Sequence, residues 1–291
     1  MLYTYPYFSR ERIKYDLNEL GAALRKSKGQ NFLIDPNSVS KIIQPIESTY
    51  NHFFRDSQIV EIGPGLGALT HRLVEFAQTL AIEVDPVFVI LLKRLFQHNK
   101  NFQIIEGDAR QILANKMAPM KSSLMTTIKA PIIVGNLPYY ISTELILASL
   151  EIKEAQYFFF LVQSEFANRL SASNAISSIT VYVQNLVKVE QIHKVPPTAF
   201  FPTPKVNSTI FSMARKTDPV SPIILEKLLR MSYRSKRKKL RNSWQIGEAF
   251  FPIELLEDLA SLLNIDTEKR PEQIEIQAFH QLSKLIDQNI K

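Results

Sequence analysis

The chain has 291 residues, 45% hydrophobic and 22% charged, which is typical of a globular protein of about two domains. It has no cysteine, which excludes disulfides, thiolate catalysis and iron–sulfur clusters and fits the reducing cytoplasm. The 35 basic and 28 acidic residues give a net charge of +7, which favours a polyanionic partner such as nucleic acid. We expect no membrane span, because no run approaches about 18 unbroken apolar residues, and no metal site, because the five histidines lack metal-ligand spacing.

The first half of the chain alternates strand-like and helix-like segments. Apolar runs predict strands at 58–62, 79–84, 102–106, 132–135 and 157–162, and helical spacing predicts helices at 68–77 and 86–98. This alternation indicates βαβ units and therefore an α/β fold with a mainly parallel sheet, covered on both faces.

The pattern changes after about residue 178. Residues 181–189 fit a helix or a strand, and 207–213 alternate like a late strand. The polar stretch 216–222, with two prolines, predicts a linker. Beyond it only helical spacing occurs, at 223–229, 252–263 and 271–286. We therefore expect one domain at 1–215 and a small all-helical domain at 223–291.

Three glycines mark the point where the first predicted strand turns into its helix. Gly63, Gly65 and Gly67 remove side chains that would collide with a ligand approaching the backbone, although a tight turn alone would also use glycine. Their Gly-x-Gly-x-Gly spacing differs from the dinucleotide fingerprint, and no P-loop lysine follows. A nucleoside ligand without a pyrophosphate fits this turn better.

The next two predicted strands are each associated with a carboxylate. Glu83 lies twenty positions after Gly63, where an acid can accept both hydroxyls of a ribose, and Asp108 can accept from an exocyclic amine. Either acid alone would read as a helix N-cap. Together with the glycine turn, both lie at the carboxyl ends of consecutive parallel strands, and this coincidence indicates S-adenosylmethionine as the cofactor.

The segment after the fourth strand reads Asn136-Leu137-Pro138-Tyr139. Proline restricts the backbone so that the Leu137 carbonyl and the Asn136 side-chain oxygen can converge on one amine, and Tyr139 offers a flat face to a flipped-out base. Two acceptors on a purine amine would aim its lone pair at the sulfonium methyl. Catalysis would then consist of positioning and electrostatics, with no general base required.

With these residues, the chain resembles the ribosomal RNA adenine dimethyltransferase family, bacterial enzymes that methylate N6 of two adjacent adenines near the 3′ end of small-subunit (16S) rRNA. The resemblance runs from about Lys26 to Trp244. Its motifs are Gly29 to Leu33, Glu61 to Gly67, Glu83 to Asp85, Gly107 to Ala109, Asn136 to Tyr139, Pro197 to Val206 and Arg234 to Trp244. The resemblance implies a Rossmann-like S-adenosylmethionine-dependent methyltransferase sheet with a helical C-terminal domain.

The same resemblance implies roles for individual residues. Asn31 and Leu33 would close over the cofactor, and the residues lining it would be Gly63, Gly65, Glu83, Asp108 and Asn136. Tyr139 and Phe200 would flank the target adenine. The C-terminal domain would dock a monomeric enzyme on the 30S subunit or its precursor through the basic residues Arg234, Lys236, Arg237, Lys238, Lys239 and Arg241.

Three residues depart from the family's pattern, and two other functions stay open. Lys28 stands where an apolar or aromatic residue is usual, Ser164 where lysine is usual, and Asn207 where aspartate is usual. These positions bear on RNA docking rather than on the cofactor. One alternative is the large-subunit (23S) rRNA methyltransferase that confers macrolide resistance, which shares the Asn-Leu-Pro-aromatic motif. The other is a ribosome-assembly factor that binds and checks immature subunits.

Overall fold

A computed structural model describes residues 5–21, 31–114, 131–174, 176–235, 237–247 and 249–290 of the chain. These residues form two compact units. The first comprises Met1–Ser164 with Gln191–Met213, and the second comprises Glu165–Glu190 with Ala214–Lys291. Residues 165–190 therefore belong with the C-terminal helices by their contacts, whereas the sequence-based boundary lies at 215–223; that boundary stays a prediction.

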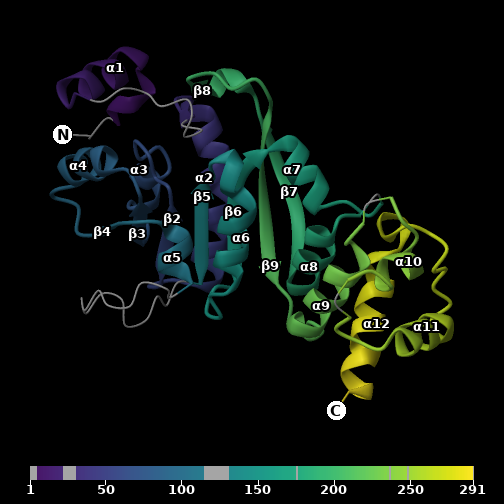
Figure 1. The fold of residues 1–291 in the computed structure, drawn as a ribbon. Helices are drawn as coiled ribbons and strands as arrows, with labels where there is room; N and C mark the ends of the chain where they lie inside the picture. Colours follow the sequence, from purple (N-terminus) through teal and green to yellow (C-terminus); the bar gives the residue numbers. More distant parts are fainter. Residues whose placement is uncertain are drawn as a thin grey trace. The chain divides into compact units, whose positions relative to one another are not determined.

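The first unit is built on a central sheet with the strand order β4-β3-β2-β5-β6-β9-β7 (Figure 1). The strands are β2 (Gln58–Ile62), β3 (Gln78–Glu83), β4 (Phe102–Glu106), β5 (Ile132–Asn136), β6 (Tyr157–Gln163), β7 (Val187–Val195) and β9 (Ser208–Arg215). The pairs β2–β3, β3–β4, β2–β5 and β5–β6 are all parallel. The predicted parallel sheet is confirmed, and its order reverses between β2 and β5, where such sheets bind ligands at the carboxyl ends.

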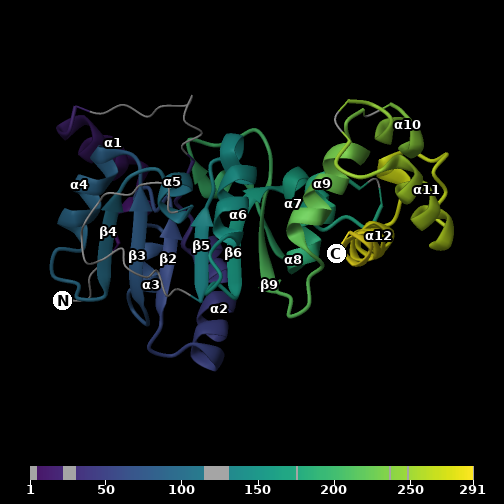
Figure 2. The ribbon, with the colours of Figure 1, turned by 60° about the horizontal axis from the view of Figure 1, so that its bottom comes forward.

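Helices connect these parallel strands, and aspartate caps begin several of them. Asp35, Asp85 and Asp108 each accept a hydrogen bond from a backbone N–H in the first turn of the following helix. The helices of this unit are α1 (Arg10–Glu19), α2 (Pro36–Phe53), α3 (Thr70–Leu73), α4 (Pro86–Leu95), α5 (Ala109–Leu113) and α6 (Ser142–Leu150). Three-residue 3-10 turns are η1 (Pro6–Phe8), η3 (Tyr139–Ile141) and η4 (Pro197–Ala199). Figure 2 shows α5 and α6 together on one face of the sheet.

The helix predicted at 68–77 is shorter than expected. Only α3, at 70–73, is α-helical, because Arg72, Glu75 and Phe76 donate their backbone N–H to the carbonyl three residues back rather than four. The apolar spacing is still used, since Leu69 and Leu73 are buried. The pattern correctly indicated the buried face and overestimated the length of the regular helix.

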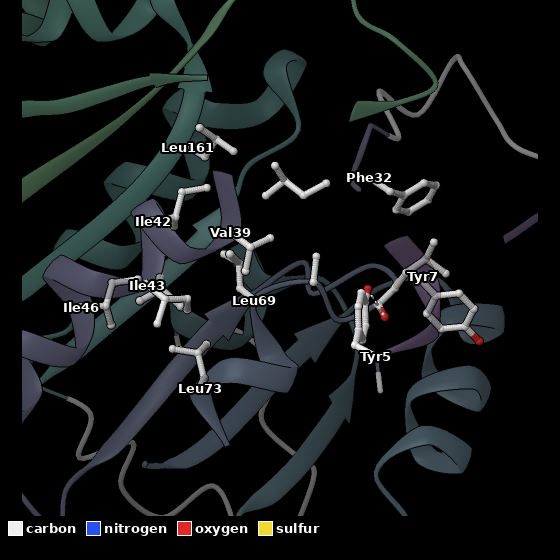
Figure 3. Close-up of a cluster of buried hydrophobic side chains, with 14 of the residues drawn as sticks. Tyr5, Tyr7, Phe32, Val39, Ile42, Ile43, Ile46, Leu69, Leu73 and Leu161 are labelled. Atoms are coloured by element: carbon white, nitrogen blue, oxygen red, sulfur yellow. Dashed lines mark hydrogen bonds between the residues drawn. The ribbon is translucent and has the colours of Figure 1, made fainter. Parts of the chain in front are cut away.

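The face of the sheet opposite α5 and α6 is covered by the main hydrophobic core. Val39, Ile42, Ile43 and Ile46 recur at helical spacing along α2, and Figure 3 shows them directed toward Leu69 beside the sheet. The N-terminal segment joins this core through Tyr5, Tyr7, Ile13 and Leu17, all of them buried. Burial of this kind stabilises by roughly 25 cal/mol per Å² of apolar area, and it anchors α1 on the central sheet.

A second, two-stranded sheet joins segments that lie far apart in the sequence. β1 (Phe32–Leu33) pairs antiparallel with β8 (Phe200–Phe201), so that Leu33 faces Phe200 and Phe32 faces Phe201. Ile34 N also donates to Ala199 O at 2.8 Å. This pairing fixes the segment that contains Asn31 and Leu33 beside the carboxyl ends of the parallel strands.

The second unit is helical and has its own core. Its helices are α7 (Ser164–Leu170), α8 (Ser178–Leu186), α9 (Pro222–Ser232), α10 (Leu240–Trp244), α11 (Ile253–Leu262) and α12 (Ile276–Asn289), with a 3-10 turn η5 (Pro271–Gln273). Trp244 is fully buried and donates its indole N–H to Ser232 Oγ at 2.9 Å. The predicted C-terminal helices are confirmed. Among the residues described, no helix combines the length and apolarity needed to cross a membrane.

Candidate active site

A cavity lies at the carboxyl ends of the parallel strands, beside the point where the strand order reverses. Each of the loops after β2, β3, β4 and β5 contributes to its wall, together with β1. Of the residues predicted to bind the cofactor or the base, those that line it are Asn31, Leu33, Gly63, Gly65, Glu83, Asp108, Asn136, Leu137, Pro138 and Tyr139. The structure thus brings together residues separated by more than one hundred positions in the chain.

The glycine turn shapes one wall of this cavity. Gly63, Gly65 and Gly67 have φ angles of +63°, +58° and +88°, a region that residues with a side chain rarely adopt. A Cβ on Gly63 would meet nothing within 4 Å, whereas one on Gly65 would lie 3.1 Å from the Phe32 ring. The backbone at Gly63 is therefore open to the cavity, whereas the backbone at Gly65 packs closely against the Phe32 ring.

Glu83 ties the glycine turn to the start of the next helix. One carboxylate oxygen accepts from Gly65 N at 3.1 Å and the other from Asp85 N at 2.8 Å. The residue is 5% exposed, and burial raises the pKa of its carboxyl despite the two backbone donors. A buried acceptor aligned in this way can take further hydrogen bonds from hydroxyls placed in the cavity.

Glu61, inside β2, is a second buried acid of this wall that the sequence reading did not single out. Its carboxylate accepts from Thr70 Oγ1 at 2.6 Å. Complete burial raises its pKa to about 8, with Thr70 opposing the shift and the charge of Glu83 adding to it. Burial therefore favours the protonated form of Glu61, and the hydrogen bond to Thr70 fastens α3 to the sheet.

We expect Glu61 to make the stability of the protein depend on pH. A carboxyl whose pKa is raised from 4.5 to about 8 on folding contributes fully below pH 4.5, and that contribution is lost as the pH rises toward 8. The free energy of unfolding should fall by up to about 1.4 kcal/mol per pH unit in this range from this one group. Urea unfolding of the wild type and of Glu61→Gln, from pH 5 to 8, measures the effect. Equal slopes for the two proteins would contradict it.

Asp108 carries out a structural task at the edge of the cavity. It caps α5 by accepting from Arg110 N at 2.9 Å, and the guanidinium of Arg110 donates to both carboxylate oxygens. Arg110 holds the pKa of the Asp108 carboxyl below its usual value. Asp108 is therefore both the N-cap of α5 and part of the cavity wall. Arg110 also lines the cavity, and the sequence analysis did not predict it.

The orientation of the Asn136 amide is set by a contact across the chain. Asn136 Nδ2 donates to the backbone carbonyl of Asn31 at 3.0 Å. Because this hydrogen bond fixes the position of the amide nitrogen, the side-chain oxygen of Asn136 points the other way and can act as an acceptor. The hydrogen bond joins the end of β5 to the start of β1, so both predicted residues hold one corner of the cavity.

The residues after Asn136 form a rigid turn. Leu137 N donates to Leu161 O of β6 at 3.0 Å, and the carbonyl of Pro138 accepts from Ile141 N and from Ser142 Oγ. The hydroxyl of Tyr139 lies 2.8 Å from Ser208 Oγ, which holds the far edge of this half-buried ring. The turn thus positions Tyr139 in the wall of the cavity, and its stacking on a base stays a prediction.

Phe200 does not lie in the cavity wall. Its side chain is 0% exposed within the main core, and its backbone pairs with Leu33. In this arrangement the ring has no free face for a base, because β8 uses it to anchor the two-stranded sheet. Side chains that do line the cavity and that sequence reasoning missed are Val84 and Tyr140, each 62% exposed. Exposed apolar residues next to motif positions are the signal that could have indicated them.

The basic run lies at the start of α10 in the second unit. Four described residues of the run are exposed, namely Arg237, Lys238, Lys239 and Arg241, and the last two both pair with Glu268. Arg234 is half-buried, and a Cβ on Gly247 would lie 2.7 Å from its guanidinium, so it packs against that backbone. Lys236, like Lys28, Gly29 and Gln30, lies outside the described residues. The basic residues of the run therefore differ in how far their charge is already engaged within the protein: Lys239 and Arg241 share Glu268, and Arg234 packs against Gly247.

Two of the three departures from the family's pattern are neighbours in space. Ser164 N donates to Asn207 O at 2.9 Å, and Ser164 Oγ lies 2.8 Å from Thr209 Oγ1. The backbone of Ser164 is therefore bonded to that of Asn207, and its side chain to that of Thr209.

Comparisons with known proteins place the chain among rRNA-modifying enzymes. The family model described as ribosomal RNA adenine dimethylase matches residues 21–288. The chain is similar to "Ribosomal RNA small subunit methyltransferase A" of Listeria monocytogenes (31% identity, 94% of this chain, 95% of the relative). The protein with the same name from Clostridium botulinum is 32% identical, over 93% of this chain and 96% of its own length.

Solved structures support the same fold. A dimethyladenosine transferase from Plasmodium falciparum matches with a TM-score of 0.68 and 24% identity, covering 89% of this chain and 98% of its own. The 23S rRNA methyltransferase ErmE matches with a TM-score of 0.66 and 21% identity, covering 88% and 100%. The predicted Rossmann-like methyltransferase architecture is thereby confirmed.

Proposed function

The chain belongs to the ribosomal RNA adenine dimethylase family, and on that premise we propose that it dimethylates N6 of two adjacent adenosines near the 3′ end of 16S rRNA, using S-adenosylmethionine. The substrate is the 30S subunit or its precursor in the cytoplasm, and the enzyme acts as a monomer. The observation that carries the proposal is the shared cavity wall made by the glycine turn, Glu83, Asp108 and Asn136.

The cavity fits S-adenosylmethionine. The backbone beside Gly63 is open and would admit the amino-acid part of the cofactor, and the buried carboxylate of Glu83 would accept from the ribose hydroxyls. Asp108, which lines the cavity, would accept from the exocyclic amine of the adenine ring, and Val84 would supply an apolar surface to that ring. Asn31 and Leu33 cover the site from β1. When bound, the cofactor supplies an electrophilic methyl group on a sulfonium.

The residues of this chain position the base. The Asn136 oxygen and the Leu137 carbonyl accept from the target amine, and the Tyr139 ring stacks on the purine. The amine lone pair is normally delocalised into the purine ring, and in the first transfer, when the amine carries two hydrogens, two acceptors on them would direct the lone pair out of the ring plane. Fixed dipoles of this kind stabilise the developing charge without reorganisation, which is the dominant source of rate enhancement in many enzymes.

The basic run of the second unit supplies a docking surface for rRNA. Arg237 and Lys238 are exposed and would contact phosphates directly, while Lys239 and Arg241 share Glu268. Binding to phosphates fixes the position of the enzyme, and the cavity then selects the base.

The proposal is tested by incubating the protein with methyl-labelled S-adenosylmethionine and small subunits that lack the methyl groups, and then mapping the modified nucleotides. We expect dimethyladenosine at two adjacent positions near the 3′ end of 16S rRNA. The matched control is large subunits from the same cells. Labelling of 23S rRNA alone would favour the macrolide-resistance type of enzyme, and no labelling of either subunit would favour a binding factor.

A further inference from the structure

The N-terminal helix α1 lies before residue 21, where the match to the family model begins. It is nevertheless built into the first unit, because Ile13 and Leu17 are buried in the main core. Tyr5, just before it, donates its hydroxyl to the carbonyl of Leu66 in the glycine turn at 3.0 Å. The ring of Tyr5 also stacks on His71 at 4.2 Å. The helix is thus held next to the wall of the cavity.

Two basic residues of α1 share one aromatic ring. The guanidinium carbon of Arg10 and the ammonium nitrogen of Lys14 each lie 5.8 Å from the centroid of Phe201. Arg10 and Lys14 are one helical turn apart, so both project from the same face of α1. Both are exposed, and neither forms an ion pair within the part of the chain that the structure describes. Arg12, by contrast, is paired with Asp16.

Phe201 places these cations beside the cavity. It is half-buried in β8 and lies opposite Phe32 of β1, which lines the cavity next to Gly65. Figure 1 shows α1 and β8 at the same end of the sheet, the end at which the parallel strands finish. Contact with an aromatic face restricts the two long side chains and leaves their charge available to an anion.

We propose that Arg10 and Lys14, held by Phe201, form a phosphate-binding site for the RNA strand whose base enters the cavity. This inference rests on the proposed function, because it takes rRNA as the substrate. The chemistry is that of paired cations recognising a phosphodiester backbone, which is independent of base sequence. The site lies in the first unit and is separate from the basic run of α10.

The salt dependence of RNA binding tests the proposal. The variant carrying Arg10→Gln and Lys14→Gln is compared with the wild type for binding an unmethylated hairpin from the 3′ end of 16S rRNA. Loss of two phosphate contacts should reduce the slope of log K against log salt by about 1.4 and weaken binding about tenfold near physiological salt. The matched control carries Arg55→Gln and Lys153→Gln, two exposed basic residues that precede β2 and β6, at the end of the sheet where the parallel strands begin. We expect it to bind like the wild type.

A charge-preserving variant separates RNA contact from packing of the helix. Arg10→Lys with Lys14→Arg keeps both charges and should keep the wild-type slope. The proposal is overturned if this variant has a smaller slope of log K against log salt than the wild type, or if the Gln variant binds RNA like the control. The second outcome would favour an acidic protein as the partner of this surface. If instead the proposed function is wrong, the wild type would show no methyl transfer, although the salt dependence of its RNA binding would still depend on Arg10 and Lys14.

Discussion

Asn136→Ala is expected to reduce methyl transfer about 100- to 1,000-fold while cofactor affinity stays within several-fold. The Asn136 amide nitrogen is held by Asn31 O, so the variant removes the oxygen proposed to accept from the target amine. Removing one preorganised polar group from a reacting centre has an effect of this size on the rate constant. Single-turnover transfer to unmethylated small subunits measures the rate, and calorimetry with S-adenosylmethionine measures the affinity.

Asn101→Ala is the matched control for this experiment. Asn101 is also half-buried, and its side chain donates to a backbone carbonyl, that of Val74, at 2.9 Å. It lies just before β4, at the end of that strand opposite the cavity. We expect this variant to lose some stability and keep its transfer rate. Full activity of Asn136→Ala would refute the role assigned to the amide.

Glu83→Ala is expected to weaken binding of S-adenosylmethionine by roughly 100-fold, about 3 kcal/mol. The estimate follows from losing two hydrogen bonds between ribose hydroxyls and a buried charged acceptor. The variant also frees the backbone N–H groups of Gly65 and Asp85, so the glycine turn loses its anchor. Calorimetric titration measures the affinity, and urea unfolding in the absence of ligand measures the loss of stability separately.

Glu106→Ala provides the control for Glu83. Glu106 lies opposite Glu83 in the β3–β4 register, ends its own strand and is exposed outside the cavity wall. Its removal should leave the affinity unchanged. If Glu83→Ala binds the cofactor as tightly as Glu106→Ala does, then Glu83 serves only to hold the turn.

The parallel sheet and the cavity edge were predictable because local patterns encode them. Strands such as 102–106 are short apolar runs, and the glycine turn, Glu83 and Asp108 each follow such a run directly. The topology of parallel strands then brings these ends together without further information. The C-terminal helices were predictable for the same reason, from their periodic apolar residues.

Elements that depend on distant contacts were not predictable in this way. β1 and β8 are two residues long and exist only because they pair across the chain, and this pairing buries Phe200. β7 was missed because its central residues are mostly exposed and polar, so residues 181–189 combined the end of α8 with the start of that strand. The raised pKa of Glu61 depends on burial, which no local pattern encodes.

The most direct test of the account is a crystal structure of the protein with S-adenosylmethionine bound. We predict that the ribose hydroxyls lie within hydrogen-bond distance of Glu83 and that the transferable methyl points toward the Asn136 oxygen. A cofactor bound away from the glycine turn, or an Asn136 amide rotated so that its nitrogen faces the methyl, would contradict the account.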